Sequence, residues 1–257
     1  MSLSNSWRSR WRQLRVHAQL PNILLSLIVV GVIVFAAVDA VRRGYIDSDT
    51  AIFLACFVPA VIIHEVSHGV VALWCGDDTA KVARRLTLNP LRHIDPVGSI
   101  IVPIIMTIIA GFPFGWAKPV PISVNRLRHP RNDAVLVGLA GPAVNILMAI
   151  VAGIGLHFLW VSNDIFNYTT GGIRVGAQFV IDFGVVNVIL AAFNLIPIPP
   201  LDGSSLVERL IPDQYMPQYY QMRMFFMIIV LVVVLTQQRI ISEYLDDLEN
   251  WYLHLFT

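Results

Sequence analysis

The chain has 257 residues, of which 56% are hydrophobic and only 14% are charged, and its formal net charge is +1. A soluble globular domain has about 45–50% apolar and about 25% charged residues, so this composition predicts an integral membrane protein. The near-zero charge gives no support to a role in nucleic-acid binding. The two cysteines, Cys56 and Cys75, do not form a C-x-x-C pair, and we expect them to be unreactive thiols.

Six apolar segments follow one another along the chain. A spanning helix needs about 20 residues, and four of the segments satisfy this length. The first is longer than the roughly 7–15-residue core of a signal peptide, so we expect a retained span, with a cleaved signal as the alternative. The last is short but lies between Arg223 and Arg239, whose side chains can snorkel. The segments are 22–41, 51–74, 98–112, 133–161, 175–200 and 223–237.

The distribution of Lys and Arg decides between two topologies. If all six segments cross the membrane and the N-terminus is cytoplasmic, 10 of these residues lie inside and 8 outside. If segment 98–112 enters and returns on the same side, 14 lie inside and 4 outside. Irregular backbone at membrane depth is tolerated where protein or water surrounds it. We therefore predict an all-α polytopic membrane protein with about five transmembrane helices plus a re-entrant or interfacial hairpin at 98–121.

No internal repeat or long hydrophilic stretch interrupts these segments. We therefore predict a single membrane-embedded domain over residues 1–257, with a core at 50–210, a basic N-terminal segment at 1–20 and an amphipathic C-terminal tail at 238–257. The tail carries aromatic residues that we expect to form an interfacial belt at the membrane surface. These residues are Trp251, Tyr252 and Phe256.

The strongest chemical signal lies in the second apolar segment, where His64, Glu65 and His68 form an H-E-x-x-H motif. On a helix the two histidines lie at i and i+4, so they share a face and can bind one Zn²⁺. The glutamate between them is placed to act as a general base on a metal-bound water. Ionisable residues at membrane depth are costly and usually functional, which makes a coincidental arrangement the weaker alternative.

A catalytic zinc usually has three protein ligands, and Asp202 is the best candidate for the third. The prolines before it cannot continue a helix, and we expect them to keep the approach to Asp202 extended, while Gly203 permits a sharp turn. His68 and Asp202 both lie near the C-terminal ends of their segments, so they share a depth only if the two helices run in the same direction. Five spans satisfy this condition, whereas six place the two residues on opposite sides.

Three motifs together resemble the site-2 protease family of intramembrane zinc metalloproteases, which is peptidase family M50. Two further segments, Asn89 to Gly98 and Gly115 to Pro121, are similar to the compact bacterial branch of that family, which has no PDZ or CBS domain. The resemblance covers about residues 50–210. The three motifs are His64-Glu65-x-x-His68, Gly141-Pro142-x-x-Asn145 and Asn194-x-x-Pro197-x-Pro199-Pro200-Leu201-Asp202-Gly203.

This resemblance implies an intramembrane zinc endopeptidase that hydrolyses a peptide bond in or near the transmembrane segment of a membrane protein, in regulated intramembrane proteolysis. It implies one Zn²⁺ per chain, bound by His64, His68 and Asp202, with Glu65 as general base. The remaining candidates are Asn145 and Asn194 as oxyanion or substrate-positioning groups and Lys118 in a substrate loop.

The expected partners are the lipid bilayer and a single-pass or other membrane-protein substrate, with no nucleic acid, and the oligomeric state stays open. We expect the bacterial plasma membrane, with a cytoplasmic N-terminus and the active site toward the cytoplasmic side. The alternatives are a polytopic transporter, because polar residues in spans often mark ion paths, and a non-catalytic scaffold. For Asn145 and Asn194 the alternative is an interhelical hydrogen bond, and for His93 we expect a structural or substrate-loop role.

Overall fold

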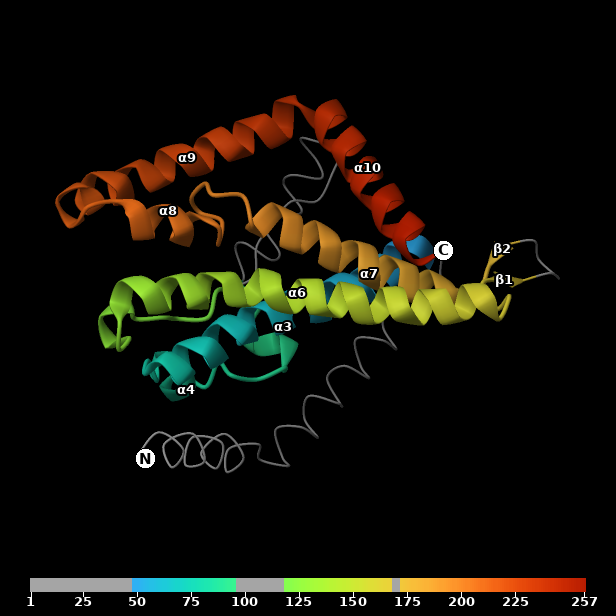
Figure 1. The fold of residues 1–257 in the computed structure, drawn as a ribbon, viewed down its shortest axis with the longest axis horizontal. Helices are drawn as coiled ribbons and strands as arrows, with labels where there is room; N and C mark the ends of the chain where they lie inside the picture. Colours follow the sequence, from blue (N-terminus) through green and yellow to red (C-terminus); the bar gives the residue numbers. More distant parts are fainter. Residues whose placement is uncertain (1–47, 96–117, 168–171) are drawn as a thin grey trace.

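The computed structural model describes residues 48–95, 118–167 and 172–257 of the chain. The N-terminal segment at 1–20, the apolar segment at 22–41 and most of the hairpin at 98–121 lie outside the described residues, so these predictions stay untested. The described part is mainly helical, as an all-α membrane protein requires (Figure 1).

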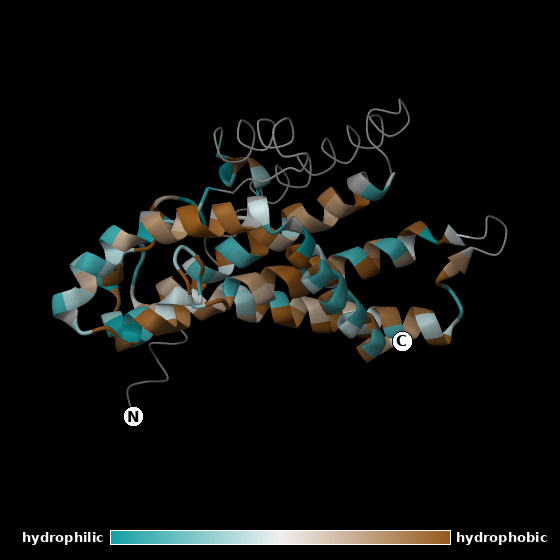
Figure 2. Cartoon of the chain, turned by 90° about the horizontal axis from the view of Figure 1, so that it is seen from above, coloured by the Kyte–Doolittle hydropathy of each residue, from teal (hydrophilic) through white to brown (hydrophobic). Residues whose placement is uncertain are grey.

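Three long helices form the centre of the described part, namely α3 (Ser48–Cys75), α6 (Pro130–Val161) and α7 (Val175–Asn194). Each is long and apolar enough to cross a membrane, which confirms the three corresponding segments as candidate spans. Hydrophobic residues cover most of these helices, and hydrophilic residues gather at the connections between them (Figure 2). The total of five spans stays a prediction.

Helices α3 and α7 run in the same direction, and α6 runs in the opposite direction and packs against both (Figure 1). Near the start of both helices the thiol of Cys56 contacts the carbonyl oxygen of Phe179 at 3.5 Å. Cys56 and Ala60 of α3 are fully buried and form a core cluster with Val186 of α7. The parallel arrangement is the one that allows the C-terminal ends of α3 and α7 to meet at one depth.

Short elements connect and extend the central helices. A second core cluster of Ala72, Leu127 and Val137 fixes the C-terminal end of α3 against the first turns of α6. The β-strands pair antiparallel beyond the far end of α6. The short elements are α4 (Thr79–Val82), η1 (Pro90–Arg92), η3 (Val124–Arg126), β1 (Phe166–Asn167), β2 (Gly172–Ile173), α8 (Ser204–Leu210) and η4 (Asp213–Tyr215).

All but the last residue of the predicted apolar segment 223–237 lies within the continuous helix α9 (Met216–Thr236). This helix follows η4 and leads directly into α10, and its main contacts are with these two neighbours. In Figure 1 it rises away from the central helices, and α10 then brings the chain back to α7.

The C-terminal tail forms the amphipathic helix α10 (Gln238–Phe256), as predicted. However, Tyr252 is only 2% exposed, and its hydroxyl donates a hydrogen bond to the carbonyl oxygen of Ala149 at 3.0 Å. Gly184 of α7 makes room for this ring, because a Cβ atom there would overlap the Tyr252 hydroxyl. The expectation of an interfacial aromatic belt is therefore wrong for Tyr252, whereas Trp251 is 57% exposed.

Candidate metal centre

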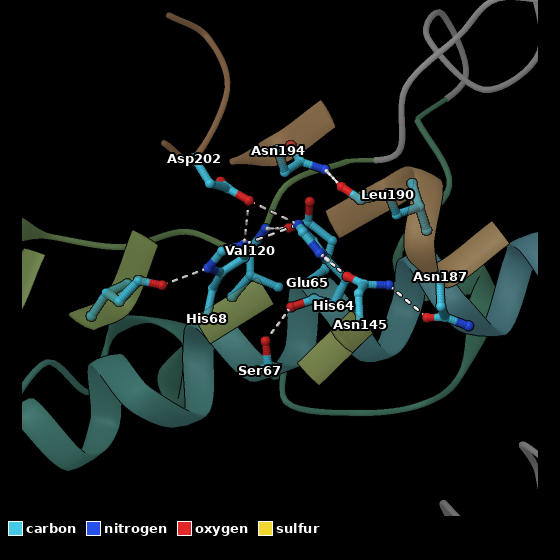
Figure 3. Close-up of polar contacts among 11 residues, drawn as sticks. His64, Glu65, Ser67, His68, Val120, Asn145, Asn187, Leu190, Asn194 and Asp202 are labelled. Atoms are coloured by element: carbon cyan, nitrogen blue, oxygen red, sulfur yellow. Dashed lines mark hydrogen bonds and ion pairs between the residues drawn. The ribbon is translucent and has the colours of Figure 1, made fainter. Parts of the chain in front are cut away.

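The two histidines of the H-E-x-x-H motif lie one turn apart on α3, and their rings face the same side of the helix (Figure 3). Both rings are buried, and their Nε2 atoms are 3.2 Å apart. The Oδ2 atom of Asp202 lies 3.0 Å from Nε2 of His64 and 3.2 Å from Nε2 of His68. The structure thus brings together the three predicted ligands, and these atoms form a group that could hold a metal ion.

The spacing of these three atoms suits a small tetrahedral metal ion. Ligand atoms about 2.0–2.1 Å from a tetrahedral zinc lie about 3.3 Å from one another, close to the separations of 3.0 to 3.2 Å measured between Asp202 and the two imidazoles. Oδ2 of Asp202 is buried and has no hydrogen-bond partner among the described residues. A buried acceptor in this position fits a bound cation, since an unpaired buried carboxylate oxygen is otherwise costly.

The ring of His68 is oriented by a backbone carbonyl. Its Nδ1 lies 2.6 Å from the carbonyl oxygen of Val137 on α6. A carbonyl oxygen only accepts hydrogen bonds, so Nδ1 carries the proton and donates. In the neutral ring, Nε2 then presents a lone pair toward His64 and Asp202, as a metal ligand requires.

The ring of His64 is oriented by a chain of buried amides that starts at another backbone carbonyl. Nδ2 of Asn187 donates to the carbonyl oxygen of Phe183 at 2.7 Å, and Nδ2 of Asn145 donates to Oδ1 of Asn187 at 2.7 Å. Oδ1 of Asn145 therefore faces His64 and accepts from its Nδ1 at 2.5 Å. Both asparagines are fully buried. Since this chain of hydrogen bonds places the proton of His64 on Nδ1, its Nε2 carries a lone pair toward the candidate metal position, as Nε2 of His68 does (Figure 3).

Gly141 allows α6 to pass directly against the two imidazoles. A Cβ atom at this position would overlap the rings of both His64 and His68. Asn145 follows four residues later on the same face of the helix, where it meets His64. The Gly-Pro-x-x-Asn pattern therefore has a physical basis, since the glycine supplies the close approach and the asparagine supplies the hydrogen bond.

The approach to Asp202 differs from the extended conformation that we expected. Helix α7 ends at Asn194, and the chain then folds back in successive turns, with the N–H of Gly203 donating to the carbonyl oxygen of Asn194 at 2.7 Å. A Cβ atom on Gly203 would overlap the carbonyl oxygens of Leu195 and Ile196. The prolines leave few N–H groups in this stretch, and those of Ile198, Leu201 and Gly203 donate to carbonyl oxygens within the turns. Gly203 lies in a turn, as expected, but its φ of −57° is one that any residue adopts, so the glycine serves the close approach of the chain.

Glu65 lies beside the three candidate ligands, and the backbone N–H of Val120 donates to its Oε2 at 2.9 Å (Figure 3). Val120 is itself 5% exposed and packs toward α3. Sequence reasoning did not identify this contact, because the donor is a main-chain group. A signal was nevertheless present, since Pro119 and Pro121 have no N–H and leave Val120 as the donor between them.

The other predicted residues make hydrogen bonds to backbone carbonyl oxygens and not to the candidate ligands. Asn194 donates from its Nδ2 to the carbonyl oxygen of Leu190 within its own helix, at 3.0 Å. Lys118 has an exposed side chain, and its backbone N–H donates to the carbonyl oxygen of His93 at 2.8 Å. His93 is buried, and its Nε2 donates to the carbonyl oxygen of Thr87 at 2.8 Å. This contact is compatible with the structural or substrate-loop role expected for it.

Fold and site together define a helical protein with three candidate membrane spans and a His-His-Asp group suited to one metal ion. The sequence profile of peptidase family M50 matches residues 172–235. The candidate zinc metalloprotease YwhC of Bacillus subtilis is 39% identical over 151 residues, which is 58% of this chain and 64% of that protein. These matches, together with the site motifs, support membership of peptidase family M50, the family that the sequence resembles.

A second relative shows a similar extent of match. The candidate zinc metalloprotease Rip2 of Mycolicibacterium smegmatis is 26% identical over 179 residues, which is 69% of this chain and 64% of that protein. The chain thus spans slightly less than two thirds of the length of these relatives. No solved structure matches the chain significantly.

Proposed function

We propose that this chain is an intramembrane zinc endopeptidase that hydrolyses a peptide bond in or near the transmembrane segment of a membrane protein. The observation that carries this proposal is the convergence of His64, His68 and Asp202 on one point beside the carboxylate of Glu65. A metal group alone would serve binding or transport equally well, whereas an adjacent general base favours hydrolysis. The names of YwhC and Rip2 as candidate zinc metalloproteases support the same class.

In this proposal His64, His68 and Asp202 would bind one Zn²⁺ per chain. Two neutral imidazoles and one carboxylate form a donor set of the kind that catalytic zinc sites use. When bound, zinc lowers the pKa of such a water to near 7 and polarises the scissile carbonyl. The hydrogen bonds to Asn145 and Val137 keep both rings in the tautomer that leaves Nε2 free.

Glu65 acts as the general base. Its Oε2 is held by the N–H of Val120, which leaves Oε1 to accept the proton of the attacking water and pass it to the leaving amine. A carboxylate with one oxygen fixed by a backbone donor has a defined orientation, and proton transfer requires such an orientation within hydrogen-bonding distance of the water.

The two asparagines play different parts in this scheme. Asn145 is fully buried and hydrogen-bonded to both His64 and Asn187, so we assign it to the positioning of His64. Asn194 is only partly buried, and one hydrogen of its Nδ2 bonds Leu190, which leaves the second for a substrate. Asn194 is therefore the better candidate for the oxyanion donor.

The substrate must present its scissile peptide with helical hydrogen bonds broken. Lys118 and Val120 each precede a proline and are therefore biased to an extended conformation. The N–H groups of Lys118 and Val120 already donate to His93 and Glu65, and the two prolines have no N–H. Residues 118–121 therefore offer a substrate only carbonyl acceptors. We infer that an extended substrate donates N–H groups to this edge. Crosslinks from a bound substrate should map to 118–121, and their consistent absence there would remove this part of the scheme.

The location follows from charge. The candidate ligands lie toward the C-terminal end of α3, and the loop after that end carries four basic residues. By the positive-inside rule such a loop is cytoplasmic, so we infer an active site toward the cytoplasmic side of the bacterial plasma membrane. These basic residues are Lys81, Arg84, Arg85 and Arg92.

Substitution of Glu65 by Gln tests the proposal. The variant should retain one zinc per chain, because Glu65 is not a ligand, but lose cleavage of a transmembrane substrate. The matched control is Glu243→Gln, which removes an exposed carboxylate on α10 and should cleave normally. If Glu65→Gln cleaves normally, Glu65 is not the general base and the mechanism as proposed is wrong. Metal transport by the Glu65→Gln variant would favour a transporter, and intact partner binding with no cleavage by wild type would favour a scaffold.

A further inference from the structure

The segment from Lys118 to Ser123 is anchored to three different parts of the protein through backbone N–H groups. Lys118 donates to the carbonyl oxygen of His93 at 2.8 Å, and Val120 donates to Oε2 of Glu65 at 2.9 Å. Ser123 donates to Oδ2 of Asp77 at 2.6 Å. The middle anchor is the proposed general base, so the position of this segment and the orientation of Glu65 are coupled.

Asp77 uses both oxygens of its carboxylate, one on each side. Oδ1 accepts hydrogen bonds from the backbone N–H and the hydroxyl of Thr79, the first residue of α4, and Oδ2 accepts from the backbone N–H of Ser123. The residue is fully buried. Burial raises the pKa of this carboxyl, but the bonds from Thr79 and Ser123 and the charge of Arg126 outweigh it, so the pKa is lowered. Asp77 is therefore ionised and accepts hydrogen bonds both from Thr79 and from Ser123 in the segment 118–123.

Few other groups can fix this segment. Pro119 and Pro121 donate no hydrogen bonds, so the N–H groups at its two ends and at Val120 carry the backbone pairing. The side chain of Val120 approaches α3 at Gly69, where a Cβ atom would lie only 2.9 Å from Cγ1 of Val120. Three residues span about 10 Å of extended chain, so a shift of Ser123 moves the N–H of Val120 relative to α3.

We propose that Asp77 is a positioning residue for catalysis, which holds the segment 118–123 in the register that places the N–H of Val120 on Glu65. The inference rests on the proposed role of Glu65 as general base. Asp77 does not touch substrate or metal and acts through Ser123 and Val120. Its loss leaves the metal ligands intact and disturbs only the orientation of the base.

Substitution of Asp77 by Asn tests this role. An amide can accept on one side only, so either the Thr79 side or the Ser123 side loses its acceptor. We expect kcat to fall about tenfold or more, since small displacements of a catalytic group have effects of this size. The KM should stay within about twofold, and the variant should retain one zinc per chain. The matched control is Asp78→Asn, which removes the neighbouring exposed partner of Arg126 and should leave kcat unchanged.

A local readout separates positioning from general stability. In the full-length protein in detergent, hydrogen exchange of Asp77→Asn should accelerate in peptides that cover 118–123 and remain unchanged in α3. If Asp77→Asn does not fold, Thr79→Val removes only the hydroxyl donor and should reduce kcat by a smaller factor, with the same local increase in exchange. A kcat within twofold of wild type in the folded Asp77→Asn variant, or in Thr79→Val where Asp77→Asn does not fold, overturns the proposal. Loss of zinc or of folding in step with kcat in Thr79→Val overturns it as well.

The Glu65→Gln variant distinguishes failure of this inference from failure of the proposed function. If Glu65→Gln is inactive while Asp77→Asn has normal kcat, the enzyme assignment stands and only the positioning role is wrong. If Glu65→Gln is active, the general base itself is misassigned and the role of Asp77 falls with it.

Discussion

The helices α6 and α7 admit rings from other helices at two places, and in both cases glycine makes the room. Gly141 allows α6 to contact the two imidazoles of the candidate metal centre. Farther along the pair, Gly153 and Gly184 allow close contact with the rings of Phe256 and Tyr252 from α10. Glycine therefore permits close approach to a polar site in one region and to packed aromatic rings in the other.

The difference between the two regions lies in the second layer of contacts. Around the imidazoles, Asn145, Asn187 and a backbone carbonyl form directional hydrogen bonds that fix which nitrogen is free. Around the aromatic rings, Leu156 and Ala177 supply buried apolar contacts, and Tyr252 makes a single hydrogen bond to a carbonyl. In both regions a glycine allows a ring to approach the helix. The neighbouring side chains then determine whether the ring serves a polar site or hydrophobic packing.

The largest effect should come from Gly141→Ala. The new methyl group would overlap both imidazoles. Because it is attached directly to the Cα atom of α6, it cannot rotate away, so we expect zinc binding and cleavage to be lost. The control is Gly155→Ala on the same helix, where a Cβ atom meets only Val180 at 3.7 Å. Zinc content and cleavage rate should remain normal in the control. Normal zinc binding by Gly141→Ala would show that the close approach is not required.

Tyr252→Ala should affect the other region. Removal of a buried aromatic ring costs about 3–5 kcal/mol in the free energy of unfolding, because the notch beside Gly184 is left empty. Thermal or denaturant unfolding in detergent measures this loss, and the zinc affinity of the folded fraction should not change. Trp251→Ala, at an exposed neighbour, should have little effect. A loss of zinc affinity in folded Tyr252→Ala would mean that the two regions are coupled.

Asn145→Leu should have a smaller effect, confined to the metal centre. The side chain keeps its approximate size but no longer accepts from Nδ1 of His64. Loss of such a ligand-orienting contact typically weakens metal affinity about 10- to 100-fold, which competition with a chelator can measure. Asn194→Leu removes only a bond within its own helix and should leave zinc affinity unchanged. Equal affinities for the two variants would contradict the positioning role of Asn145.

Several features of the site were predictable because they depend on spacing along the chain. The four-residue spacing places His64 and His68 on one helical face, and a comparison of depths selects Asp202 and requires parallel helices. The structure shows this arrangement in α3 and α7. The contact of Asn145 with His64 was not predictable, because an asparagine at this position could equally serve as an oxyanion donor or as a partner in an interhelical hydrogen bond.

Other features depend on contacts whose partners no sequence pattern identifies. The N–H of Val120 is a main-chain group, and its partner Glu65 lies 55 residues away. An amphipathic helix that lies on lipid has the same pattern as one that packs on protein, which explains the wrong expectation for Tyr252. The turns before Asp202 arise from hydrogen bonds within residues 194–204, whereas proline content alone favours an extended chain.

The most direct measurement of the central claim compares bound zinc and cleavage in the same samples of Asp202→Ala and Glu65→Gln. If Asp202 is a ligand and Glu65 the general base, Asp202→Ala loses both zinc and cleavage, whereas Glu65→Gln keeps one zinc per chain and loses only cleavage. Retention of both zinc and cleavage by Asp202→Ala would contradict the His-His-Asp centre as the site of the reaction.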